Sequence, residues 1–263
     1  MFAADLLPYV GPLMLIATAG LILLSEALEP GEVHAGQAWL AGAAFVAAGA
    51  AALFGQAGPP LTLFPLGMSM GVLDGLARAG GVVIAFAGAL TVPLSYDDLR
   101  RRGLPVAEHL ALLLFAGAGL ILWVAARNLV LLFLALELFS LSLYVLAGYA
   151  RESAPSREAA LKYFLLGSFA SALFLLGIAF VYSAAGTLDL AGVQWWEQEH
   201  RTPPPVFLVG AALLLAGLAF KVAAFLSKIR VTRARTARRS MSALSATRKV
   251  CVNCLALSSM SLP

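Results

Sequence analysis

The chain contains few charged residues and few cysteines. Charged residues make up 12% of the 263 residues, hydrophobic ones make up 61%, and the mean hydropathy is +0.89. A charge content this low excludes an ordinary soluble domain. Both cysteines, Cys251 and Cys254, lie near the C-terminus, so residues 1–250 contain no thiol for a disulfide or an iron–sulfur cluster.

Sequence motifs for nucleotide or metal binding are also absent. The chain has no phosphate-binding loop and no glycine-rich dinucleotide pattern after a strand. Its three histidines, His34, His109 and His200, are not spaced with acidic residues as metal ligands would be. We therefore expect no cofactor and no metal in this chain.

Long apolar stretches dominate the sequence instead. Seven of them have the length of a membrane-spanning helix, about 20 residues, and helix breakers such as Pro30-Gly31 and Pro203-Pro204-Pro205 flank them. The sequence thus predicts an all-α integral membrane protein with about seven transmembrane helices in the lipid bilayer. The predicted spans are residues 9–28, 36–54, 72–94, 106–125, 128–149, 159–184 and 206–226.

The loops predict how these helices are oriented. Three arginines at 100–102 follow the third span, Arg151 and Arg157 follow the fifth, and a basic tail follows the seventh. The loops on the other side hold few cations, and positive loops favour the cytoplasm. We expect the N-terminus outside and the tail in the cytoplasm.

Glu137 and Lys221 are charged residues deep inside two predicted spans. A charge at the bilayer centre costs about 2.5–3.5 kcal/mol on insertion scales, so it rarely persists without a role. At helical spacing from Glu137 only Ser140 is polar, and we expect the carboxylate to have a partner on another helix. An acid and a base in apolar surroundings indicate a proton or ion pathway.

Other interpretations of these residues stay open. Glu137 could form a static buried ion pair that fixes helix register, and Lys221 could extend its ammonium to the membrane interface. Lys162, a few residues into the sixth span, is a third candidate whose position suits an interfacial lysine equally well. Arg127, between two spans, suits an interfacial anchor.

Three segments carry a resemblance to a known family. They are AARNLVLLFLALELFSLSLYVLAGYARE, EAALKYFLLGSFASALFLLGIAFVYSAAGTLDL and LLLAGLAFKVAA. They resemble the antiporter-like membrane subunits of respiratory complex I, and among these subunit N of bacterial NADH-quinone oxidoreductase. The resemblance is strong over about residues 106–224 and weaker, by topology, before them.

The resemblance implies a proton-translocating subunit of fourteen helices, built from two inverted repeats of five. Glu137 matches the glutamate of the fifth helix, Lys162 the lysine of the sixth and Lys221 that of the seventh. Lys221 would be the central proton carrier, Glu137 the charge that tunes it and Lys162 a relay. NADH, FMN, iron–sulfur clusters and quinone would lie on other subunits.

The partners implied are the other membrane subunits of the complex, in the inner membrane of a bacterium. Two alternatives stay open. One is a membrane scaffold that moves no protons, because half of an antiporter fold could lack an exit path. The other is a cation/proton antiporter subunit of the same superfamily.

The predicted organisation has three parts: three N-terminal helices in 1–105, the start of the first repeat with four helices in 106–226, and a basic tail in 227–263. Residues 228–263 hold eight of the 18 basic residues and none of the 14 acidic ones. Such a tail could bind anionic lipid or nucleic acid, and its single CxxC is weak evidence for zinc or redox chemistry.

A shifted reading frame explains the tail better. The family pattern stops at Ala224, where the resemblance implies a Pro-Phe-His segment and then an eighth helix. We therefore expect a frame shift near codon 225, a non-native or disordered tail, no nucleic acid partner, and a missing C-terminal half.

Overall fold

The computed structural model describes residues 9–28, 35–55, 62–63, 68–69, 71–200 and 202–221. The chain forms two compact units, Met1–Leu218 and Ala219–Pro263, and the elements below lie in the first apart from the final residues of the last helix. In the described ranges, six helices are long and apolar enough to cross a membrane. They are α2 (Val10–Leu28), α3 (Ala35–Phe54), α4 (Gly75–Arg102), α5 (Val106–Ala125), α6 (Leu129–Ala147) and α7 (Ala154–Ala185).

The helix ends follow from local sequence. The Asn128 side chain accepts a hydrogen bond from the Val130 backbone N–H at 2.8 Å and so caps the start of α6. Gly103 ends α4 and Gly186 ends α7, each with a positive φ in the left-handed region that glycine adopts without steric cost. These caps fix one end of each of the helices α4, α6 and α7.

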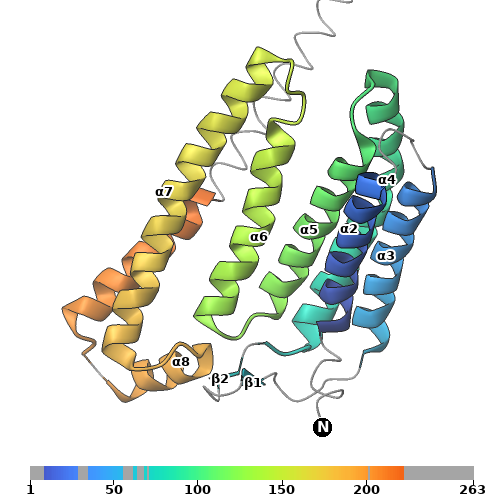
Figure 1. Cartoon of the computed structure of the whole chain (residues 1–263). Coiled ribbons are helices and arrows are strands. Elements are labelled where there is room, and N and C mark those ends of the chain that lie inside the picture. Colours follow the sequence, from blue (N-terminus) through green and yellow to red (C-terminus); the bar gives the residue numbers. More distant parts are fainter. Residues whose placement is uncertain are drawn as a thin grey trace, which may run out of the picture. The chain divides into compact units, whose positions relative to one another are not determined.

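Helices α2, α3, α4 and α5 pack together, and α6 lies between α5 and α7 (Figure 1). The core of the four-helix group centres on Phe45, which is fully buried against glycines of two neighbouring helices. A Cβ on Gly117 would lie only 2.5 Å from the Phe45 ring. Small residues at helix crossings allow this close approach, which drives association where lipid surrounds the helices.

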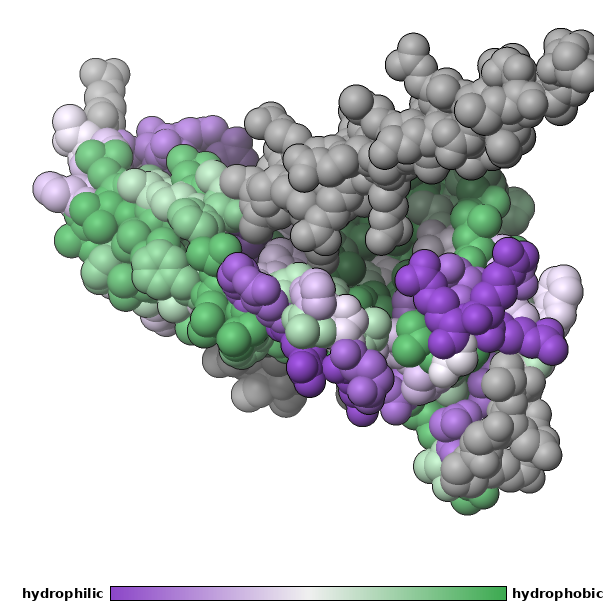
Figure 2. Space-filling view, turned by 90° about the horizontal axis from the view of Figure 1, so that it is seen from above, coloured by the Kyte–Doolittle hydropathy of each residue, from purple (hydrophilic) through white to green (hydrophobic). Residues whose placement is uncertain are grey.

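The outer surface is strongly apolar. Large hydrophobic side chains of α7 are exposed, among them Leu161, Phe164, Leu165 and Phe169. The space-filling view from above shows several separate groups of hydrophilic residues and a broad hydrophobic area on one flank (Figure 2). This division fits a protein whose sides contact lipid and whose ends reach water.

Six of the seven predicted spans are confirmed, with two changed boundaries. Helix α4 ends at Arg102 rather than 94, because its last two turns are polar and its C-terminal arginines complement the helix dipole. Helix α7 begins at Ala154 rather than 159, since Pro155 suits a first helical turn. The seventh span appears as the shorter apolar helix Pro205–Lys221, and residues 222–226 lie outside the described part.

Residues 190–199, which lie between the sixth and seventh predicted spans, form helix α8 (Leu190–Glu199). None of its residues is buried, and Trp196 stacks on His200 with ring centroids 4.4 Å apart. The loop before α4 contains a minimal antiparallel hairpin, β1 (Thr62–Leu63) and β2 (Met68–Ser69). The predicted tail, 227–263, also lies outside the described residues.

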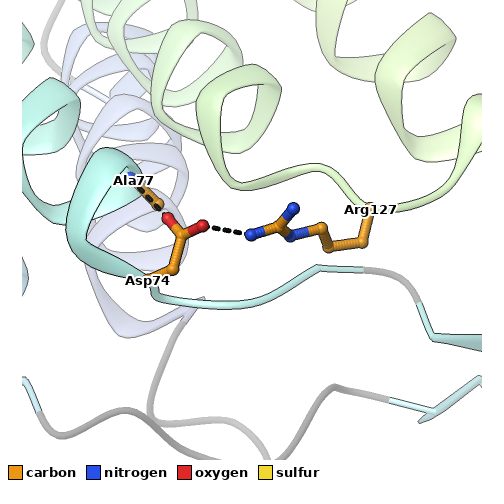
Figure 3. Close-up of polar contacts among 3 residues, drawn as sticks. All are labelled: Asp74, Ala77 and Arg127. Carbon is orange, nitrogen blue, oxygen red and sulfur yellow. Dashed lines mark hydrogen bonds and ion pairs between the residues drawn. The ribbon is translucent and has the colours of Figure 1, made fainter. Parts of the chain in front are cut away.

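One end of the bundle is joined by Asp74. One oxygen of its carboxylate accepts a hydrogen bond from the Ala77 backbone N–H at 2.8 Å and caps α4, and the other pairs with Arg127 between α5 and α6 (Figure 3). Both side chains are partly exposed, 36% and 46%. This ion pair therefore joins the connection between α5 and α6, which carries Arg127, to the start of α4.

We predict that replacing Gly119 by alanine destabilises the protein, by about 1–3 kcal/mol as for other overpacked sites. The new Cβ would lie 2.7 Å from the Phe139 backbone nitrogen and 2.9 Å from the Ala135 carbonyl oxygen, on α6. Thermal unfolding in detergent measures the effect. Gly20→Ala is the matched control, because nothing lies within 4 Å of its new Cβ; equal melting of the two variants would contradict the close α5–α6 contact.

We predict that Asp74→Ala destabilises the protein more than Arg127→Gln does. The first change removes a helix cap, worth about 1 kcal/mol, together with an exposed ion pair worth about 0–1 kcal/mol; the second removes only the pair. Denaturation of the two single variants and the double variant measures both contributions. If Arg127→Gln lost more stability than Asp74→Ala, the Asp74 cap would contribute nothing to the stability of the protein.

Candidate functional site

Helix α6 places Glu137 in the middle of a membrane span. The glutamate is the ninth of 19 residues of the helix, about 12 Å from its first residue at 1.5 Å per residue. Its side chain is partly buried. The face that carries Glu137 is opposite to the face that packs on α5, where Ala135 and Phe139 contact Gly119.

Helices α6 and α7 form an antiparallel hairpin with a regular register. Gly148 faces Ala160, the Tyr144 ring meets the Tyr163 ring edge-on with centroids 4.8 Å apart, and Phe133 stacks on Phe174. In each pair the two residue numbers add to nearly the same value, as expected of a hairpin closed by a short connection, here 148–153. We call this line of facing residues the α6–α7 seam.

The same register places Ser171 opposite Glu137. The Ser171 hydroxyl donates a hydrogen bond to the Glu137 carboxylate at 2.5 Å, and Ser171 itself is buried. A hydrogen bond to a charged group is stronger than a neutral one and offsets part of the cost of burying the carboxylate. Glu137 therefore has a polar contact from another helix, as the sequence predicted, although Ser171 was not foreseen.

Two further polar groups lie along the seam. The Ser140 hydroxyl donates to the Leu136 carbonyl oxygen at 2.6 Å, and Tyr144 lies one turn further along the same face of α6. Both residues are buried. A row of hydroxyls thus extends from Glu137 towards the 148–153 connection.

The sequence contained a signal for Ser171. Two long helices joined by a short connection must fold back on each other, and counting outward from residues 148–153 places residue 171 opposite residue 137. A serine inside an otherwise apolar stretch then becomes a candidate contact. Reading each helix by itself, without this pairing, missed it.

Lys162 does not lie beside Glu137. It is nine residues before Ser171 on α7, about 13 Å along the helix axis. Its side chain is 70% exposed, and its ammonium pairs with Glu158 one turn earlier on the same helix. Lys162 therefore occupies the end of the hairpin near the 148–153 connection.

Lys221 is the last described residue of helix Pro205–Lys221. This helix packs on α7 through glycines; a Cβ on Gly177 would lie 2.7 Å from the Leu214 backbone nitrogen. Lys221 itself belongs to the second unit, Ala219–Pro263, so its pairing with Glu137 stays a prediction.

A search of the described residues for metal sites found no group of three or more His, Cys, Asp and Glu side chains that could hold an ion. What the seam offers chemically is a carboxylate hydrogen-bonded to the Ser171 hydroxyl, with Ser140 and Tyr144 further along the same face of α6. Such groups bind and pass protons.

One family of membrane proteins matches more than half of this chain. The family model described as "NADH:quinone oxidoreductase/Mrp antiporter, TM" matches residues 126–262, which is more than half of the chain and includes α6 and α7. The chain therefore belongs to this family of membrane proteins.

Individual relatives point to one branch of the family. Subunit N 1 of the NADH-quinone oxidoreductase of Solibacter usitatus is 43% identical over 65% of this chain and 34% of the relative. Subunit N of Myxococcus xanthus is 36% identical over 84% of this chain and 42% of the relative. The chain thus spans about a third to two fifths of the length of these curated relatives.

A solved structure shows the same fold. The respiratory complex I from Thermus thermophilus with bound aureothin contains a chain with a TM-score of 0.62 and 28% identity to this one. The match covers 81% of this chain and 44% of that chain. The helical arrangement described above is therefore an arrangement found in a respiratory membrane complex.

We predict that cysteines at positions 148 and 160 form a disulfide, in a background where Cys251 and Cys254 are serine. The Cβ positions lie 2.7 Å apart, and a small shift brings them to the usual spacing of about 3.8 Å. Mobility on a non-reducing gel after cleavage between the helices measures cross-linking. The control pairs position 148 with 161, one residue further round α7; cross-linking only in the control would show a different register.

Proposed function

We propose that this chain supplies part of a proton-translocating membrane subunit of an NADH-quinone oxidoreductase, of the subunit N type. Electron transfer from NADH to quinone would occur on other subunits, and this chain would carry no redox centre. The observation that supports the proposal best is the Glu137 carboxylate, held in mid-span by the Ser171 hydroxyl. A carboxylate at this depth is expensive and indicates a proton or ion route.

Three residues would take part in proton movement, each in a different role. Lys221 would be the central carrier, because a lysine in apolar surroundings can gain and lose its proton reversibly. Glu137 would control the proton affinity of that lysine through its charge. Lys162 would be a relay, and its exposed position at the end of the hairpin fits exchange between water and the interior.

We place the protein in a bacterial inner membrane, in contact with lipid and with other membrane subunits of the complex. The N-terminus would be outside and the C-terminal part in the cytoplasm. The arginines at the end of α4 and Arg151 between α6 and α7 support this orientation, because positive charge favours the cytoplasmic side.

The proposal predicts that Glu137→Gln, in the assembled complex, lowers NADH-driven proton pumping several-fold while the complex still assembles. The amide keeps the shape of the side chain and removes the charge and the titratable proton. Dye-monitored proton uptake into membrane vesicles measures pumping, and a native gel measures assembly. Glu197→Gln, on exposed α8, is the matched control and should pump normally. Wild-type pumping in Glu137→Gln would remove Glu137 from the mechanism.

The description of the matching family also includes Mrp antiporters, so a cation/proton antiporter is the second candidate. The identities of 36–43% to subunit N relatives favour the oxidoreductase. Pumping that depends on sodium and not on NADH would favour the antiporter. An assembled complex that pumps equally with and without a functional Glu137 would favour a scaffold.

A further inference from the structure

The α6–α7 seam is polar on one side of Glu137 and apolar on the other. Towards the 148–153 connection the seam contains Ser140, Tyr144 and Tyr163. Away from it the next pair is Phe133 and Phe174, whose rings stack with centroids 6.3 Å apart and an interplanar angle of 12°. Glu137 lies at the boundary between these two halves.

The polar half is built around the Tyr144 hydroxyl. Tyr144 is 6% exposed, and its hydroxyl lies directly against Gly167, where even a methyl group would overlap it. Glycine at 167 therefore leaves the space that the hydroxyl occupies between the helices. Ser140 lies between Tyr144 and Glu137 on the same face of α6, one turn from each.

The apolar half is tightly filled. Phe174 is 4% exposed and belongs to a cluster of buried apolar residues with Leu129, Ile178, Val181 and Phe207. A proton needs polar groups or water to move, and this cluster supplies no polar side chain among its members. The stacked phenylalanines close the seam beyond Glu137.

We propose that Tyr144 and Ser140 carry protons between Glu137 and the 148–153 end of the hairpin, that Ser171 positions the carboxylate, and that Phe133 and Phe174 close the opposite side. The proposal rests on the proposed function and deepens it, because it gives the Glu137 carboxylate a proton route that is open only at the 148–153 end of the hairpin. That end is polar: Arg151 pairs there with Glu108 at 3.1 Å.

The proton movement balances at each atom. A proton that arrives at the Tyr144 oxygen displaces the phenolic proton to the Ser140 oxygen. The Ser140 hydroxyl turns from the Leu136 carbonyl and gives its own proton to the Glu137 carboxylate. Both hydroxyls end neutral, and the carboxylate becomes a carboxylic acid. Ser171 holds the carboxylate in place by donating its hydrogen bond.

The test uses the complete complex in membrane vesicles and the variant Tyr144→Phe. This variant keeps the ring contacts with Tyr163 and Phe164 and removes only the hydroxyl. General acid–base groups contribute about 10²–10⁴-fold to rates, and water can partly replace a hydroxyl, so we expect pumping to fall about tenfold. We also expect a larger H₂O/D₂O rate ratio, because proton transfer becomes the slow step.

Ser140→Ala should behave like Tyr144→Phe, and it tests the same route if Tyr144→Phe fails to assemble. Ser171→Ala should lower pumping and Ser171→Thr, which keeps a hydroxyl, should restore it. The matched controls are Tyr182→Phe and Ser168→Ala, exposed residues of α7, the helix that also carries Ser171. Both controls should pump at the wild-type rate with an unchanged isotope ratio.

The outcomes separate this inference from the proposed function. If Glu137→Gln is impaired while Tyr144→Phe and Ser140→Ala pump normally, the hydroxyl route is wrong and the function stands. If Glu137→Gln pumps normally, Glu137 has no part in pumping, and the role proposed for this carboxylate fails together with the hydroxyl route. A lower rate in Tyr144→Phe with an unchanged isotope ratio and a lower melting temperature would show a structural role only, and would overturn the route.

Discussion

The burial of one carboxylate in an apolar helical hairpin is the constraint on which the site depends. Glu137 lies where lipid and apolar side chains surround α6, and it needs a polar contact inside the protein. Ser171 supplies that contact only while the register of α6 and α7 is kept. In a helix, a shift of one residue turns a side chain by about 100°, so the contact would be lost. The close contacts of Gly148 with Ala160 and of Tyr144 with Gly167 therefore keep the Glu137 carboxylate opposite Ser171.

The packing also gives the two faces of α6 different roles. One face meets α5 so closely that Gly119 lies against the α6 backbone, and this contact joins α6 to the four-helix group around Phe45. The opposite face carries Glu137, Ser140 and Tyr144 towards α7. Residues that pack on α5 and polar residues that face α7 alternate along α6, because the helical period places them on opposite faces of the helix. A polar row can thus exist without weakening the bundle core.

Much of the fold could be predicted from the sequence, because apolar length and helix breakers act locally. The spans of α2, α3, α5 and α6 agree with the sequence to within a few residues. The ends of α4 and α7 differed, since a helix continues past the apolar segment wherever polar residues and caps support it. Helix α8 was missed because its ten residues are too short and too polar to show an apolar period against the surrounding loop. Residues of the seventh span beyond Lys221 lie outside the described part.

The sequence by itself determined that Glu137 lies in mid-span and requires a contact from another helix, since depth along a helix and the cost of a buried charge depend only on local composition. Which residue makes that contact was decided by the tertiary structure, because the pairing of α6 with α7 depends on the length of a connection and on the close approach of small residues far apart in the chain. The same pairing placed Lys162 at the exposed end of the hairpin, away from the carboxylate. The closure of the seam by Phe133 and Phe174 likewise arises only when two aromatic residues from separate helices meet.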